Sequence, residues 1–158
     1  MKPTINIREA RKEDGPSIAL VHTVTVSAIE TNLYTREEIE SWATPRSLDG
    51  YAELIQTREC FVAEVDDQIA GFGVLNPATS VIDAVYVSPS ASGRGIGLRL
   101  LHTLEERALS LGLKTLQLNA SLNAVPFYRR AGYLGAEQKK YKLQTGVEIS
   151  CVPMSKIL

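Results

Sequence analysis

The spacing of hydrophobic residues divides the first third of the chain into one strand and two helices. An alternating run at residues 5–8 predicts a short strand. Asp14 precedes a proline by two positions, and this pair predicts the cap of a helix over residues 16–29. A threonine cap with acidic first-turn residues predicts a second helix over residues 35–44, and residues 48–56 fit a further turn or two.

The middle of the chain is rich in strands. Residues 60–65 and 69–75 are apolar runs separated by Asp-Asp-Gln, an arrangement that predicts a hairpin. Residues 81–87 form a nearly continuous apolar run, as in a strand that is buried on both faces. A glycine-rich segment at residues 93–97 leads into the clearest helix, in which hydrophobic residues recur at helical spacing as far as residue 111.

The last third of the chain returns to short elements. Residues 114–119 predict a strand, residues 124–131 a short helix, and residues 137–143 and 147–154 two closing strands. The predicted order is therefore β-α-α-β-β-β-α-β-α-β-β. Because hairpins flank a strand-helix-strand unit, we expect one α/β domain over residues 1–158, with a mixed, mostly antiparallel sheet of about seven strands and about four helices.

Composition and charge exclude several classes of protein. Hydrophobic residues make up 44% of the chain and charged residues 22%, which is typical of a globular domain. The formal net charge is -1, whereas nucleic-acid-binding modules usually carry a strong basic excess, so no nucleic acid partner is expected. The absence of an apolar leader and of a long apolar run predicts a cytoplasmic protein with no membrane partner. Cys60 and Cys151 are predicted to be buried thiols.

Three glycines alternate at the start of the predicted long helix, at Gly93, Gly95 and Gly97. Glycine lets the backbone approach a ligand closely, and the free amides of a helix N-terminus bind anions such as phosphate. Arg94 would add a charge-assisted contact. The spacing fits neither a dinucleotide fingerprint, which needs a glycine where Leu98 stands, nor a P-loop, which needs Gly-Lys-Ser/Thr. The alternative is a glycine-rich turn that only caps the helix.

A second motif lies downstream, where residues 124–133 read Ala-Val-Pro-Phe-Tyr-Arg-Arg-Ala-Gly-Tyr. Together the two motifs resemble the GNAT superfamily of N-acetyltransferases. The loop is similar to the superfamily's Gln/Arg-x-x-Gly-x-Gly/Ala, except that Ser92 replaces the first residue. The downstream segment is similar to Ala-x-x-Phe-Tyr-x-x-x-Gly-Phe, with Tyr133 at its last position. The resemblance covers residues 5–154 and implies the GNAT fold, with acetyl-CoA as the acyl donor.

The resemblance also implies where acetyl-CoA would bind. The backbone of residues 85–87 would hydrogen-bond the pantetheine arm like an added strand, and residues 93–98 would hold the pyrophosphate. Asn119, Asn123 and Phe127 would line the far side of the cofactor. The implied cofactor-binding residues are Val85, Tyr86, Val87, Ser92, Gly93, Arg94, Gly95, Ile96, Gly97, Leu98, Asn119, Asn123 and Phe127.

Two residues are candidates for proton transfer during attack of an amine on a thioester. Tyr128 matches the superfamily's general acid. An ordinary phenol pKa of about 10 lies only about 1.5 above that of a thiol, so protonating the leaving thiolate costs about 2 kcal/mol. Asp83 is the sole charge in the strand at residues 81–87 and is a candidate base, acting directly or through water. The alternatives are a packing role for Tyr128 and a solvated or hydrogen-bonded strand role for Asp83; Glu64 is a weaker candidate base.

The expected reaction is direct transfer of the acetyl group to a primary amine of a small molecule or peptide within a ternary complex. In this superfamily the first two helices and the sheet edge usually build the acceptor pocket. Tyr34 and Trp42 are therefore candidate acceptor-binding residues, although the spacing of Trp42 also fits a core residue. His22 and His102 lack partners at useful spacing, so no metal and no catalytic histidine are expected. A non-catalytic acyl-CoA sensor is the alternative function, and the resemblance is compatible with a homodimer.

Overall fold

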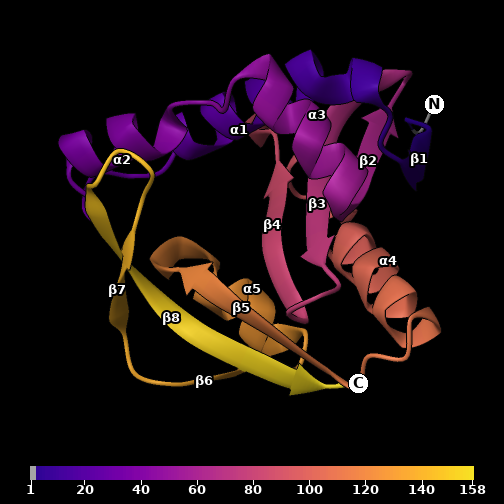
Figure 1. Ribbon diagram of the computed structural model, residues 1–158. Helices are drawn as coiled ribbons and strands as arrows, with labels where there is room; N and C mark the ends of the chain where they lie inside the picture. The colour runs from indigo at the N-terminus through magenta and orange to yellow at the C-terminus, as the bar shows by residue number, and fades with distance from the viewer. Residues whose placement is uncertain (1–2) are drawn as a thin grey trace.

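The computed structural model describes residues 3–158, and its strands form a single mixed sheet (Figure 1). The strand order is β1-β2-β3-β4-β5-β8-β6, and β7 also pairs with β8. Among the described strands only β4 and β5 pair in parallel, so the predicted mixed, mostly antiparallel α/β fold is confirmed. The strands are β1 (Ile5–Glu9), β2 (Glu59–Val65), β3 (Gln68–Asn76), β4 (Val81–Val87), β5 (Thr115–Ser121), β6 (Leu134–Gly135), β7 (Lys139–Lys142) and β8 (Glu148–Ile157).

Helices cover both faces of the half of the sheet that contains β1 to β4. Figure 1 shows α4 in orange beside β3 and α1 to α3 in purple across the top of the molecule. Within residues 3–158 no helix is long and apolar enough to cross a membrane. The α-helices are α1 (Gly15–Ser27), α2 (Arg36–Ala43), α3 (Leu48–Thr57), α4 (Ile96–Ser110) and α5 (Val125–Arg130).

Consecutive apolar residues in the strand β2 pack on opposite faces of the sheet. Val62 packs in one cluster with Ile18 of α1 and Tyr51 of α3. The next residue, Ala63, packs in a second cluster with Leu104 of α4. Successive side chains of a strand point to opposite faces, so β2 is buried on both sides between the two helical layers.

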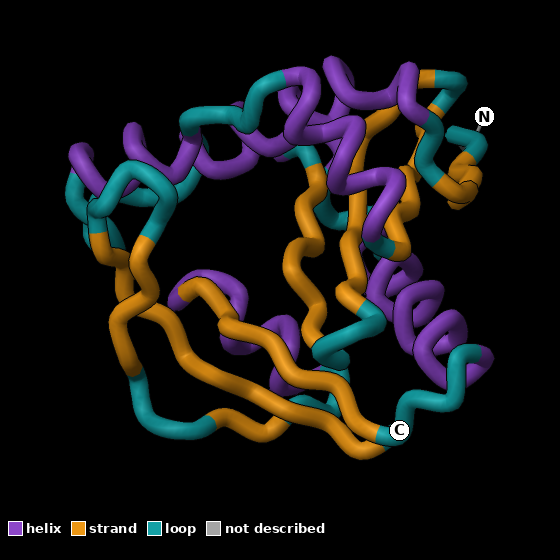
Figure 2. Tube along the Cα trace, viewed as in Figure 1, coloured by secondary structure: helices purple, strands orange, loops and turns teal. Residues whose placement is uncertain are grey.

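The strands β4 and β5 hold together at one end only. Val81 pairs with Gln117 near the start of each strand, and the structure contains no further pair between them within residues 3–158. Beyond this pair the strands diverge toward their carboxyl ends at Val87 and Ser121, as Figure 2 shows at the centre of the molecule. The sheet therefore opens as a wedge at the place where two neighbouring strands would otherwise exchange hydrogen bonds.

The wedge is closed at its far end by α2 and by the hairpin of β7 and β8. Thr35 caps α2, because its hydroxyl accepts a hydrogen bond from the amide of Glu38 over 3.1 Å while the Glu38 carboxylate accepts one from the Thr35 amide over 2.8 Å. Trp42 and Ile149 pack in one cluster and so join α2 to β8. The predicted cap of this helix is thus confirmed.

Two local features differ from the sequence prediction, whereas the helix α3 matches the predicted residues 48–56 to within one residue. The cap of α3 is Ser47, which accepts a hydrogen bond from the amide of Gly50 over 3.1 Å. The short strand β6 was not predicted, because two residues carry too little pattern to be recognised. Asp14 stands at the N-cap of α1, but its carboxylate bonds to Arg8 and to the amide of Arg11 instead of to the helix.

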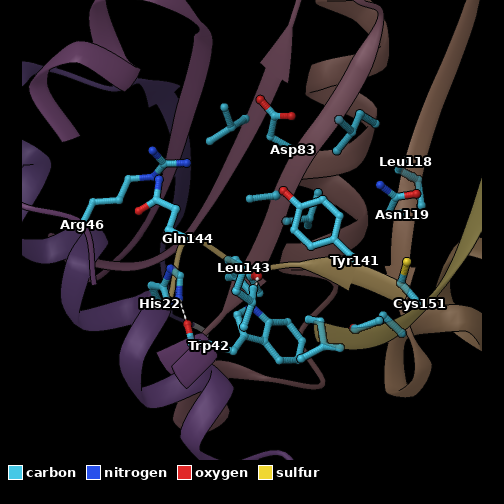
Figure 3. Close-up of a pocket in the computed structure, with 18 of the residues that line it drawn as sticks. His22, Trp42, Arg46, Asp83, Leu118, Asn119, Tyr141, Leu143, Gln144 and Cys151 are labelled. Atoms are coloured by element: carbon cyan, nitrogen blue, oxygen red, sulfur yellow. Dashed lines mark hydrogen bonds between the residues drawn. The ribbon is translucent and has the colours of Figure 1, made fainter. Parts of the chain in front are cut away.

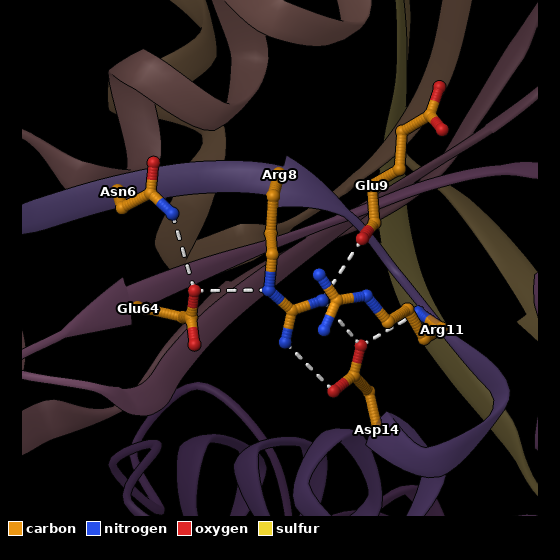
Figure 4. A network of polar contacts seen from close by, with 6 residues as sticks. All are labelled: Asn6, Arg8, Glu9, Arg11, Asp14 and Glu64. Carbon is orange, nitrogen blue, oxygen red and sulfur yellow. Dashed lines mark hydrogen bonds and ion pairs between the residues drawn. The ribbon is translucent and has the colours of Figure 1, made fainter.

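The Asp14 carboxylate belongs to a polar network that fastens β1 to the rest of the fold (Figure 4). The guanidinium of Arg8 donates to both carboxylate oxygens of Asp14, over 2.8 and 3.0 Å, and to Glu64 of β2 over 3.0 Å. Asn6 donates to the same oxygen of Glu64 over 3.3 Å. Such a bidentate pair fixes the direction of both groups, so the network holds the edge strand and the start of α1 in register.

Candidate active site

A cavity of about 610 Å³ lies in the wedge between β4 and β5 (Figure 3). Residues 81–86 of β4 form one wall, and Asn119 lies on the β5 side. Trp42 of α2 and Tyr141 of β7 line the opposite side, so segments far apart in the sequence meet around one space. A cavity of this volume is in the range of small-molecule binding sites.

The glycine segment forms a tight turn at the start of α4, next to the end of β4. Gly93 and Gly95 have φ angles of 80° and 76°, in the left-handed region that favours glycine. Within residues 3–158, the amides of residues 93–98 find no hydrogen-bond acceptor, whereas the amide of Arg99 begins the helical pattern by bonding to Gly95. Free amides at the positive end of a 15-residue helix are the arrangement to which anionic groups bind in other proteins, and the motif predicts such a site here.

The third glycine of the segment has a different role. A Cβ atom built at Gly97 would lie 3.3 Å from the ring of Phe127 in α5 and 3.7 Å from Val87 at the end of β4. The absence of a side chain therefore lets the two motifs found in the sequence pack directly together. This contact places the glycine turn beside the helix that carries Tyr128.

The end of β4 offers backbone groups to the wedge. Ser88 donates its amide to Ala70 of β3 over 2.8 Å, so the alternate residues Val85 and Val87 direct their amides and carbonyls away from β3. The carbonyl of Val87 accepts a hydrogen bond from the hydroxyl of Thr25 in α1 over 3.2 Å. The remaining outward groups of Val85 and Val87 are an open strand edge of the kind to which an extended ligand pairs.

Tyr128 lies on α5 with its ring buried and its position on the cavity lining. The rings of Phe127 and Tyr133 stand edge-on to it, with centroids 5.0 and 5.8 Å away. No residue within 3–158 hydrogen-bonds to its hydroxyl. Burial raises the pKa of Tyr128 above the ordinary value of 10, and the neighbouring Tyr86 adds to the effect, so the phenol stays protonated at neutral pH.

Asp83 lies on the cavity because β4 bulges at this residue. Val74 and Leu75 of β3 pair with Ala84 and Ile82, which leaves Asp83 as the extra residue between them. Its carboxylate lies 3.5 Å from the Nε atom of Arg58. Burial raises the pKa of Asp83, and the positive charge of Arg58 counteracts that rise.

The side chain of Tyr86 also lines the cavity, although the sequence pointed only to its backbone. The indole N–H of Trp42 donates to the Tyr86 hydroxyl over 3.1 Å, and the ring of His22 lies 5.4 Å away. Burial raises the pKa of Tyr86 to about 12. Strict alternation would place Asp83 and Tyr86 on opposite faces of β4, and the bulge at Asp83 shifts that alternation by one residue.

The sequence predicts no catalytic role for His22, but the residue lines the cavity. Its Nε2 atom lies 2.7 Å from the carbonyl oxygen of Trp42, which assigns the ring proton to that nitrogen. Burial lowers the pKa of His22, so the ring is neutral at pH 7. A single histidine in an apolar helix gives no indication in the sequence that it lines a cavity. His102 lies exposed on α4, away from the cavity.

The remaining predicted residues fall into two groups. Asn119 and Trp42 line the cavity, whereas Asn123 is exposed and lies outside the lining. Tyr34 is 2% exposed, donates its hydroxyl to the carbonyl of Ser150 and accepts from the amide of Leu122, so its ring belongs to the core cluster rather than to the cavity.

The side chains around the glycine turn differ in their burial. Arg94 and Leu98 are exposed, Ile96 is buried in the core, and the Ser92 hydroxyl donates to the carbonyl of Pro89 over 2.8 Å. Ser92 therefore stabilises the turn itself. In the described part of the chain no group of His, Cys, Asp and Glu side chains gathers as a metal site, and both cysteines are free and buried.

Comparison with known proteins places the chain in a family. A family model described as an acetyltransferase (GNAT) domain matches residues 30–158. The peptidyl-lysine N-acetyltransferase YjaB of Salmonella typhimurium is 30% identical over 135 residues, which cover 82% of this chain and 83% of the relative.

Solved structures show the same fold. A GCN5-related N-acetyltransferase from Rhodopseudomonas palustris superposes with a TM-score of 0.91 at 25% identity, covering 100% of this chain and 99% of the other. The PaiA N-acetyltransferase of Thermoplasma acidophilum, solved in complex with coenzyme A, superposes with a TM-score of 0.78 at 21% identity, covering 98% and 99%. The wedge, the glycine turn and these matches agree, and the chain belongs to the GNAT family as an acetyl-CoA-dependent acyltransferase.

Proposed function

We propose that the cavity is where an acetyl group passes directly from acetyl-CoA to a primary amine of a small molecule or peptide, without a covalent enzyme intermediate. One observation carries the proposal: Tyr128 and Asp83, a candidate acid and a candidate base, line the same cavity where β4 and β5 diverge. The relative YjaB, named a peptidyl-lysine N-acetyltransferase, acts on a primary amine of this kind.

The residues around the wedge fit an extended thioester cofactor with a pyrophosphate group. The free amides of residues 93–98 and the exposed Arg94 would hold the pyrophosphate. The outward backbone groups of Val85 and Val87 would bind the pantetheine arm like an added strand. Phe127 would pack beside it and Asn119 would border it from β5. When bound, acetyl-CoA supplies the activated acetyl group.

Tyr128 would donate a proton to the thiolate sulfur as the C–S bond breaks. Because burial raises the pKa of the phenol, its proton is available at neutral pH. The raised pKa makes the phenol a weaker acid, but the wedge also disfavours the thiolate, since both anions lose hydration there. The amide of Val87, which faces the wedge, would stabilise negative charge on the acyl oxygen.

Asp83 would take the proton that the attacking amine must lose. A carboxylate whose pKa is raised by burial holds a proton more strongly than an exposed one, which makes it a better base. The Nε atom of Arg58 lies 3.5 Å from a carboxylate oxygen of Asp83, and its positive charge favours the ionised carboxylate before the amine binds. Asp83 would also attract an incoming ammonium group by charge.

The test is release of coenzyme A from acetyl-CoA in the presence of a panel of amino acids, polyamines, aminoglycosides and peptide N-termini. Wild-type protein should release thiol with at least one amine, and Tyr128→Phe should lower kcat at least about 100-fold while binding of coenzyme A stays unchanged. The matched control is Tyr133→Phe, which removes a hydroxyl bonded to Glu105 outside the cavity. Normal turnover of Tyr128→Phe would remove Tyr128 from the mechanism, and coenzyme A binding without turnover of any amine would indicate a sensor.

A further inference from the structure

The charges around the cavity are not balanced. Among residues 3–158, three charged residues line it: Arg46 from the loop between α2 and α3, Asp83 from β4 and Lys142 from β7. The one carboxylate already has a partner, because Asp83 lies 3.5 Å from Arg58. The cavity lining therefore carries an excess of positive charge, although the whole chain has a formal net charge of -1.

Arg46 is an exposed residue whose backbone is held against the start of α3. Its amide donates to the hydroxyl of the buried Tyr51 over 3.4 Å. The stem of its side chain packs against the backbone of Gly50, where an added Cβ atom would come within 3.3 Å of the Arg46 Cβ. Within residues 3–158 its guanidinium forms no ion pair and no hydrogen bond, and Figure 3 shows it among the side chains drawn around the cavity.

The charge of Arg46 reaches the other polar groups of the site. It lowers the pKa of Asp83 and that of His22, in each case as a smaller effect than the burial of the group itself. Arg46, Asp83 and His22 line the same cavity, so a ligand bound there would lie near the charge of Arg46. Its planar guanidinium matches the geometry of a carboxylate, to which it donates two parallel hydrogen bonds.

We propose that Arg46 forms a carboxylate-binding subsite, and that the acceptor is an amine that also carries a carboxylate, an amino acid rather than a polyamine. This inference rests on the proposed function, since it names the class of amine used at the same site. The ammonium group of the amino acid would lie toward Asp83 and its carboxylate toward Arg46. Both charges of such a ligand would then meet an opposite charge on the cavity lining.

A polyamine fits the same lining poorly. Its first ammonium group pairs with Asp83, but each further ammonium group meets only Arg46 and Lys142, which repel it. Charge on the lining therefore discriminates between the two classes of amine independently of their shape.

The rest of the lining suits an apolar or aromatic side chain on that amino acid. Trp42, Tyr51 and Phe72 contribute rings from α2, α3 and β3, and Tyr141 contributes one from the hairpin. Tyr141 is 48% exposed, so it lines the cavity on the side that faces solvent. A ligand ring placed there would contact aromatic faces at low cost in conformational entropy.

Acceptors that differ in their carboxylate group test the contribution of that group to recognition. We would compare L-phenylalanine with the neutral L-phenylalaninamide and with phenethylamine, which lacks the group altogether, in the coenzyme A release assay. Wild-type protein should prefer phenylalanine in kcat/KM. Arg46→Met should lower the ratio of phenylalanine to phenylalaninamide at least about tenfold, mainly through KM for phenylalanine. Comparing ratios between variants removes the intrinsic reactivity of each amine.

Two further variants make the assignment specific. Arg46→Glu should reverse the preference, because a negative charge would then repel the carboxylate. Arg36→Met removes an exposed arginine of α2 that does not line the cavity, and it should leave the ratio unchanged. An unchanged ratio in Arg46→Met, a preference of the wild type for the uncharged amines, or loss of the ratio only in Lys142→Met would each overturn the assignment to Arg46.

Binding measurements keep this inference separate from the proposed catalysis. Trp42 is the sole tryptophan of the chain and lines the cavity, so its fluorescence reports on ligands bound there. With coenzyme A present, phenylalanine should bind more tightly than phenylalaninamide, and Arg46→Met should remove the difference. Preferential binding without any turnover would contradict the proposed function and support the subsite. Turnover without preference for the carboxylate would support the function and overturn the subsite.

Discussion

The ring of Phe127 lies against Gly97, so closely that a Cβ atom on the glycine would sit 3.3 Å from its Cε1 atom. This contact joins the glycine turn before α4 to the helix α5, although 30 positions separate the two residues in the sequence. The turn and the candidate acid Tyr128 are therefore held in a fixed relationship by packing rather than by hydrogen bonds.

We predict that Gly97→Ala raises KM for acetyl-CoA by about three- to tenfold. Alanine favours the helix at this position, but its methyl group pushes the ring of Phe127 away from the turn. Steady-state kinetics of the single variant and of Gly97→Ala combined with Phe127→Leu check this reason. The smaller leucine side chain should restore most of the lost affinity, and strictly additive effects of the two substitutions would contradict the contact.

The pH dependence of the reaction should respond to Arg58. Burial raises the pKa of Asp83 and the charge of Arg58 opposes that rise, so Arg58→Leu should raise it further. If Asp83 must be ionised to accept a proton, the acidic limb of the kcat/KM profile will move to higher pH in this variant. Asp83→Asn should lower kcat/KM at least about tenfold and remove that limb. A profile that Arg58→Leu leaves in place would exclude Asp83 as the titrating base.

Stability at low pH should depend on the pair of Arg8 and Asp14. The hydrogen bonds from Arg8 hold the pKa of Asp14 below the ordinary value of 3.8. A depressed carboxyl pKa stabilises the fold fully above about pH 4, and this contribution is lost as pH falls through the folded-state pKa. Urea unfolding of Asp14→Asn should show lower stability at pH 7 and a smaller loss of stability between about pH 4 and pH 2 than the wild type. Parallel curves for the two proteins would show that other groups govern acid unfolding.

Glu105 should matter for stability and little for catalysis. It is 8% exposed on α4, and the same carboxylate oxygen accepts a hydrogen bond from the Tyr133 hydroxyl over 2.9 Å and from Lys156 over 3.0 Å. Glu105→Ala leaves both donors without their acceptor, which should cost about 2–4 kcal/mol in the free energy of unfolding. Denaturant unfolding measures the loss. The exposed neighbour Glu106→Ala is the control and should change stability by less than about 0.5 kcal/mol.

Most elements of the fold were predictable because each carries its own pattern. The amphipathic helix after the glycine turn buries Leu100 and Leu104 as its spacing requires, and the capping box at Thr35 starts α2 where the sequence places it. These features depend on residues three or four positions apart, so local sequence contains the information. The strand β6 was missed, since its pairing with the distant strand β8 decides whether it forms.

The sequence by itself determined the family, the glycine turn and the candidate acid Tyr128, because each rests on a motif of neighbouring residues. Only the tertiary structure decided which side chains share the cavity. It brought Asp83 and Tyr86 to one site through a bulge in β4, placed Arg46 and Tyr141 around the same space, and moved Tyr34 into the core. The physical reason is that the cavity forms where β4 and β5 stop pairing, and strand divergence depends on how both halves of the sheet pack rather than on any local run of residues.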